Sequence, residues 1–220
     1  MEETDYKYFR KKILLSSLLP FFLVTIMWLV KISESVFGIE LTRFGIYPLT
    51  FEGLPGIILS PFIHDDYRHI FNNTLPLFFL MVALFYFYPD QAIKIFLWTY
   101  LFTGVLVWFF GRSAWHIGAS GLVYGIASFH FFSGIIRKYF RLIALSMLIV
   151  FLYGSMVWGL FPDFYRNVSW ESHMLGFVSG VVLALVYRNE GPQPPSYEWM
   201  EEDDEDEDDE NGDPGTMNKK

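Results

Sequence analysis

Six long apolar stretches constrain this chain more than any other feature of its sequence. They cover residues 13–30, 70–88, 95–111, 113–136, 142–162 and 172–187. A helix crosses the roughly 30 Å hydrocarbon layer in about 20 residues, and backbone groups left unpaired in lipid cost several kcal/mol each. The sequence therefore predicts an all-α membrane protein, a polytopic bundle of six transmembrane helices occupying residues 13–188.

Composition supports lipid as the solvent of this chain. Hydrophobic residues make up 53% of it and aromatic residues 20%, which is more than a soluble domain of this length usually carries. There is no cysteine, which excludes a disulfide framework and a thiol protease. We expect the lipid bilayer as a partner and no nucleic acid.

Basic residues indicate the orientation. With the N-terminus in the cytoplasm, nine lysines and arginines of the membrane body face inward and five face outward, which agrees with the positive-inside rule. Residues 1–12 form a basic cytoplasmic N-terminus, and no cleavage site typical of a signal peptide follows the first apolar stretch. An even number of spans places the C-terminus in the cytoplasm as well.

Two segments outside the six apolar stretches differ in composition. Residues 34–67 form a long external loop rich in Phe, Ile, Leu, Gly and Pro, and this composition predicts a partly embedded element. Residues 189–220 carry a block of acidic side chains that cannot bury a core, so we expect a disordered, acidic cytoplasmic tail. Such a tail is most simply a solvated, repulsive segment, and binding of an unknown partner is the alternative.

Polar side chains gather where the second, fourth and sixth apolar stretches begin, and the predicted topology places all three at the external leaflet. Polar groups at membrane depth are costly and tend to be functional. Residues spaced by four share one helix face, so each of these openings presents a small polar cluster. The clusters contain His64, His69, Asn73, Ser120, Tyr124 and His173.

Two pairs of glycines suggest how these clusters meet. Gly121 and Gly125 form one small-xxx-small pair, and Gly176 and Gly180 form another. Such pairs allow two helix backbones to approach closely in lipid. If the fourth and sixth helices pack through these faces, a serine and a histidine come within reach of each other.

A serine beside a histidine is the minimal activated nucleophile, because the imidazole takes the hydroxyl proton during attack and returns it to the leaving amine. Ser120 and His173 fit these roles. The oxyanion that develops needs donors already in place, and His69, Asn73 and the Ser120 backbone N–H could supply them. Taken singly, each residue has a structural interpretation, such as helix packing or an interfacial anchor. It is their convergence on one leaflet that favours chemistry.

The chain resembles the rhomboid family of intramembrane serine proteases, in its basic six-helix bacterial form. The resemblance covers about residues 13–188. It rests on three motifs: His64-x4-His69-x3-Asn73, Gly118-Ala119-Ser120-Gly121 with Tyr124, and His173-x2-Gly176-x3-Gly180.

This resemblance implies that Ser120 is the nucleophile, His173 the general base and Tyr124 a support for its ring. It implies an oxyanion site formed by His69, Asn73 and the Ser120 backbone, with transmembrane proteins as substrates. It also implies no metal or organic cofactor and a location in the bacterial cytoplasmic (inner) membrane. Residues 158–167 would border substrate entry.

Two departures from the family pattern affect the first loop. A Trp-Arg pair often found there is absent, and Tyr67 stands where tryptophan is common. Other protease chemistries lack their residues: there is no His-Glu-x-x-His helix, no pair of aspartates within the spans and no G-x-S-x-G elbow. A non-catalytic relative that binds transmembrane helices is the main alternative, and a transporter is a weaker one.

Overall fold

The structure is a computed structural model, and it describes residues 3–152, 158–161 and 169–192. Within this part of the chain there are seven α-helices and two short 3-10 helices, and β-structure is limited to one isolated bridge. The elements are α1 (Glu3–Phe37), η1 (Thr42–Phe44), α2 (Gly56–Leu59), η2 (Ser60–Phe62), α3 (Tyr67–Phe87), α4 (Ala92–Phe110), α5 (Ser120–Ile136), α6 (Phe140–Leu152) and α8 (Trp170–Val186).

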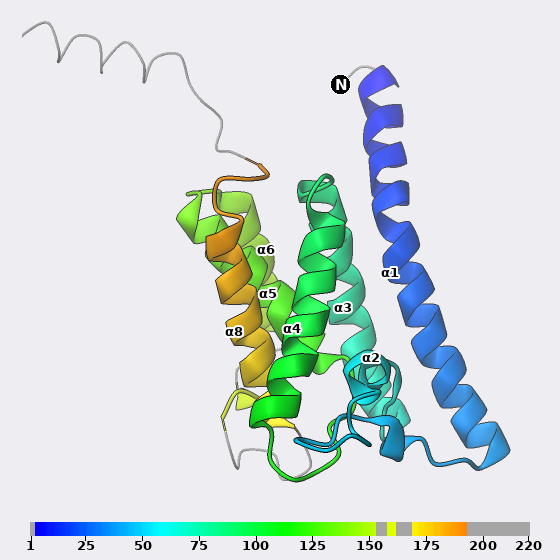
Figure 1. Cartoon of the computed structure of the whole chain (residues 1–220). Coiled ribbons are helices and arrows are strands. Elements are labelled where there is room, and N and C mark those ends of the chain that lie inside the picture. Colours follow the sequence, from blue (N-terminus) through cyan, green and yellow to red (C-terminus); the bar gives the residue numbers. More distant parts are fainter. Residues whose placement is uncertain (1–2, 153–157, 162–168, 193–220) are drawn as a thin grey trace, which may run out of the picture.

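The long helices stand side by side as an upright bundle, with α1 on its flank (Figure 1). The start of α1 and the end of α8 lie at the same end of this bundle, and α2 lies at the opposite end (Figure 1). That this common end faces the cytoplasm stays a prediction.

Three of these helices, α1, α3 and α4, are long and apolar enough to cross a bilayer. Helices α5 and α8 are apolar but have 17 residues each, and the described part of α6 has 13. The prediction of an all-helical membrane bundle is confirmed to this extent. That α5, α6 and α8 also cross the bilayer, which would complete six spans, stays a prediction.

The fourth helix begins later than its apolar stretch. Hydropathy places the span at residues 113–136, whereas α5 starts at Ser120. Gly118 has a φ of 100°, a left-handed conformation that no helix contains and that favours glycine. His116 is also held in an extended bridge to Ile46. The backbone therefore turns sharply just before Ser120, which becomes the first residue of the helix.

Helices α5 and α8 pack with their backbones nearly touching, as the two glycine pairs predict. A Cβ built on Gly176 would lie 2.0 Å from the Gly121 carbonyl oxygen, and one on Gly180 would lie 2.0 Å from that of Gly125. A side chain at either of these two glycines would collide with the facing backbone. Most of α5 is buried between its neighbours, so it forms the centre of the bundle.

The loop after α1 folds onto α4. The Leu49 N–H donates to the Trp108 carbonyl at 3.0 Å, and the Trp108 indole N–H donates to the Thr50 carbonyl at 2.9 Å. The Tyr100 hydroxyl donates to the Ile58 carbonyl. At its tip the loop presents apolar side chains outward, with Phe51 90% exposed. These contacts give the loop a defined structure, and its partial embedding in lipid stays a prediction.

Candidate active site

The first residue of α5 and the first turn of α8 meet through their side chains. The Ser120 Oγ lies 2.7 Å from the His173 Nε2, a hydrogen-bond distance between residues 53 positions apart in sequence. His173 is buried, whereas Ser120 is partly exposed.

Two contacts hold the His173 ring in place. Its Nδ1 lies 2.9 Å from the Gly159 carbonyl oxygen. A carbonyl can only accept, so Nδ1 carries the hydrogen and Nε2 keeps the lone pair that accepts from the serine hydroxyl. Tyr124 stacks on the ring, with centroids 4.3 Å apart and planes inclined by 16°. The ring is thus oriented by a backbone carbonyl and an aromatic face, where many serine hydrolases use a carboxylate.

The expected oxyanion donors lie against the turn that precedes Ser120. A Cβ built on Gly118 would lie 2.7 Å from the His69 Nε2 and 3.8 Å from the Asn73 Nδ2. Both side chains project from the start of α3, where the Asp66 carboxylate caps the helix by accepting the His69 N–H at 2.6 Å. The Ser120 N–H belongs to the first turn of α5, so it has no partner within that helix.

His64 is buried and packs against the ring of His69. It is 1% exposed, and its ring makes an edge contact with that of His69, with centroids 4.9 Å apart. Burial, followed by the proximity of His69, lowers the pKa of His64 to about 3. The ring is therefore neutral at physiological pH, and it acts as a packing surface for His69.

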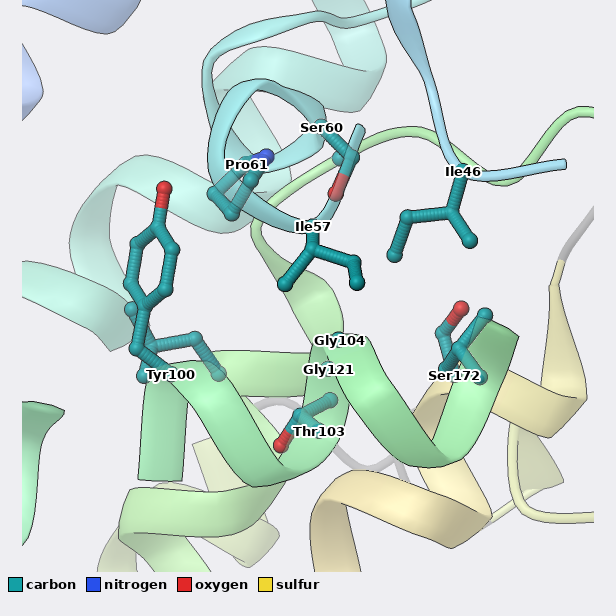
Figure 2. A pocket seen from close by; sticks show the side chains of 12 residues that line it. Ile46, Ile57, Ser60, Pro61, Tyr100, Thr103, Gly104, Gly121 and Ser172 are labelled. Atoms are coloured by element: carbon teal, nitrogen blue, oxygen red, sulfur yellow. The ribbon is translucent and has the colours of Figure 1, made fainter. Parts of the chain in front are cut away.

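A small cavity lies between the first loop, α4 and the starts of α5 and α8, and neither Ser120 nor His173 is among its lining residues. It has a volume of about 30 Å³ and is lined by Ser60, Thr103, Gly118, Gly121 and Ser172 among others. Figure 2 shows Ile57 and Ser60 of the first loop above Thr103 and Gly104 of α4, with Ser172 of α8 alongside. A space of this size holds about one water molecule. The Thr103 hydroxyl is buried, with no hydrogen-bond partner among the described residues.

Lys31 of α1 fastens the segment that leads into α3. Its Nζ donates to the Glu34 carboxylate at 2.8 Å and to the carbonyls of His64 and Asp65 at 3.0 and 2.7 Å. Lys31 is 7% exposed, so its charge depends on these partners. The positive-inside count treats this lysine only as an external charge, whereas the structure buries it behind the His64–His69 pair.

We expect Lys31→Met to lower the free energy of unfolding by about 2 kcal/mol, because two carbonyls lose their donor and the partly buried Glu34 carboxylate keeps only the Leu41 N–H. Unfolding in mixed micelles measures the change. The Lys31→Met/Glu34→Gln double variant should recover part of the loss, since it removes the orphaned charge. A single variant as stable as the wild type would show that water replaces the ammonium group at no cost.

The structure brings together all the sequence-predicted site residues. Gly121, Gly176 and Gly180 bring α5 and α8 together, and Gly118 provides the turn before Ser120. The roles assigned to these residues stay predictions. Sequence reasoning missed Gly159 as the partner of His173, because any residue can offer a carbonyl and no motif marks one.

Comparisons with known proteins place these residues in context. A family model described as the rhomboid domain matches residues 52–190, which contain every residue of the site. An uncharacterized protein of Mycobacterium tuberculosis is 30% identical over 175 residues, covering 74% of this chain and 71% of that protein. An uncharacterized protein of Mycobacterium leprae is 31% identical over 182 residues, covering 74% of this chain and 68% of that protein.

Proposed function

The chain belongs to the rhomboid family, and on that premise we propose that it is an intramembrane serine endopeptidase. Its substrates are membrane proteins, which it cleaves in or near their transmembrane segments. The family and the apolar helices support an integral membrane protein with protease-like function. The observation that carries the finer proposal is the 2.7 Å contact between Ser120 and His173.

The proposed reaction begins with attack of the Ser120 Oγ on a peptide carbonyl, while the His173 Nε2 takes the hydroxyl proton. The imidazolium that forms keeps its Nδ1–H on the Gly159 carbonyl. It then protonates the leaving amine, which departs and leaves an ester on Ser120. A water molecule next attacks this ester, with His173 again as the base, and releases the acid product.

Negative charge develops on the carbonyl oxygen at both attacks. In the proposed reaction the Ser120 N–H and the side chains of His69 and Asn73 donate to this oxygen, and the positions of both side chains around Gly118 support the proposal.

The proposed setting is a bacterial cytoplasmic membrane, with both ends of the chain in the cytoplasm and the site near the outer leaflet. The common end shared by the start of α1 and the end of α8 supports this arrangement (Figure 1). The acidic segment proposed as a tail lies outside the described residues from residue 193 onward.

A fluorophosphonate probe tests the proposal, because it labels only a serine that is activated for attack. Purified wild-type protein in detergent should label, whereas Ser120→Ala and His173→Ala should not. Ser179→Ala is the matched control: its hydroxyl is buried in α8 and donates to the Leu175 carbonyl, away from the site. If the wild type stays unlabelled while an active rhomboid protease labels alongside it, binding of transmembrane helices without catalysis becomes the better interpretation.

A further inference from the structure

Three separate segments of the chain meet at His116. Its backbone forms a two-way bridge with Ile46 of the first loop, through hydrogen bonds of 2.9 and 2.8 Å. Its ring Nε2 lies 3.0 Å from the Arg112 carbonyl oxygen, just after α4. Its Nδ1 lies 2.6 Å from the Ser169 Oγ, at the start of α8. The residue is 2% exposed, so these contacts satisfy a ring that has little access to water.

The direction of these hydrogen bonds follows from the partners. The Arg112 carbonyl accepts, so Nε2 carries the hydrogen and Nδ1 accepts from the Ser169 hydroxyl. Burial, more than any neighbour, lowers the pKa of His116, while the Arg112 carbonyl and the Glu171 carboxylate act to raise it and the Arg112 charge to lower it. The neutral ring suits both contacts.

Ser169 carries the connection into α8. It is the N-cap of that helix, and its Oγ accepts the Ser172 N–H at 3.3 Å. Its Oγ also lies 2.7 Å from the Ser172 Oγ, so the hydroxyl of Ser172 can donate to it. Ser172 immediately precedes His173. The chain of hydrogen bonds from His116 therefore ends in the helical turn that presents the proposed base.

The other side of His116 leads to the proposed nucleophile. Only three residues separate it from Ser120, and the Gly118 N–H between them donates to the Ser60 carbonyl at 2.9 Å. The glycine pairs hold α5 and α8 together farther along the helices.

Near the site, two side-chain contacts join the loop before Ser120 to the start of α8. His116 Nδ1 contacts the Ser169 Oγ at 2.6 Å in the interior, and the half-exposed Arg112 guanidinium lies 3.5 Å from the Glu171 carboxylate. The His116 contact is the shorter of the two, and its ring is the buried partner.

On the basis of the proposed function, we propose that His116 is a positioning residue, which sets the distance between Ser120 and His173 through its hydrogen bond to Ser169. Its ring is buried, so we assign it no contact with the substrate. It acts by holding the α8 cap against the loop that ends at Ser120. Loss of the bond lets the first turn of α8 move, and the proton transfer from Ser120 then begins from a longer distance.

Substituting His116 by asparagine or by glutamine tests its two ring contacts one at a time. The side-chain amide of asparagine lies where Nδ1 does and can still accept from Ser169, whereas that of glutamine lies where Nε2 does and reaches only Arg112. We expect His116→Gln to lower kcat about tenfold with little change in KM, the worth of one positioning hydrogen bond. His116→Asn should recover most of this loss.

The Ser169 side of the bond gives an independent check. If one hydrogen bond carries the effect, His116→Gln/Ser169→Ala should be no slower than the slower single variant. Ser179→Ala, which removes a buried hydroxyl from the same helix without touching this connection, should leave kcat unchanged. Equal losses in His116→Gln and His116→Asn, or additive losses in the double variant, would overturn the proposal.

Amide hydrogen exchange separates this inference from the proposed function. In His116→Gln, exchange should speed up in residues 169–176 and stay unchanged in the rest of α8, whether or not the protein hydrolyses anything. Faster exchange in a protein that never labels with the fluorophosphonate would support the connection and contradict the protease. Unchanged exchange in an active enzyme would contradict the positioning role and leave the protease intact.

Discussion

Replacing Ser120 by alanine is expected to lower kcat/KM for cleavage of a transmembrane substrate by about 10⁴- to 10⁶-fold, the loss typical of removing a serine nucleophile. The remaining groups of the site bind substrate and stabilise an oxyanion, but they offer no atom for covalent attack. Cleavage of a fluorogenic single-span substrate in proteoliposomes measures the rate over this range.

The same experiment shows whether the two residues act as a unit. His173→Ala should lose a similar factor, because an unassisted serine hydroxyl is a weak nucleophile at neutral pH. The Ser120→Ala/His173→Ala double variant should be no slower than the slower single variant. Multiplying losses would mean that the 2.7 Å contact is not used in the reaction, and an active Ser120→Ala would point to a different nucleophile.

Gly176→Val should lower the free energy of unfolding by about 3 kcal/mol, because overpacking at a rigid contact cannot be relieved by a rotamer change. The new Cβ would lie 2.0 Å from the Gly121 carbonyl oxygen, which is backbone and cannot move alone. Helix α8 must therefore shift away from α5. Reversible unfolding in micelles measures the stability, and fluorophosphonate labelling should fall in parallel, since the shift separates His173 from Ser120.

The matched control for this substitution is Val178→Ile on the same helix. Val178 is 41% exposed and faces outward, so an added methyl group meets detergent or lipid and not a backbone. Its stability should stay within about 0.5 kcal/mol of the wild type, as for most surface changes. If Gly176→Val were as stable as this control, the close approach of α5 and α8 would not be required by the fold.

Much of the membrane body could be predicted from local patterns. Apolar runs near 20 residues in length predict helices, because lipid leaves the backbone no other way to pair its polar groups. A spacing of four places His69 with Asn73, and Ser120 with Tyr124, on single helix faces, since the α-helix repeats every 3.6 residues. The glycine pairs identify the faces where two helices can touch. These inferences need only residues close together in sequence.

The exact start of helix α5 could not be predicted from hydropathy. Hydropathy extends the fourth span back to residue 113, but the positive φ of Gly118 and the bridge at His116 make the helix begin at Ser120. Neither feature changes the apolar character of the segment, so the hydropathy pattern does not reveal where the helix begins. The start of α5 matters because it presents the Ser120 N–H at a helix terminus.

The contacts that hold the site together depended on the tertiary structure alone. Gly159 serves His173 through a carbonyl that every residue possesses, and its value lies in its position. Lys31 resembles an exposed loop cation until the fold places two carbonyls around its Nζ. His116 resembles an ordinary histidine near the start of an apolar span until the cap of α8 meets its ring. Sequence determines which helices form and which faces they bury, because those properties are local. Which atoms meet between distant segments of the chain is decided by how the helices pack.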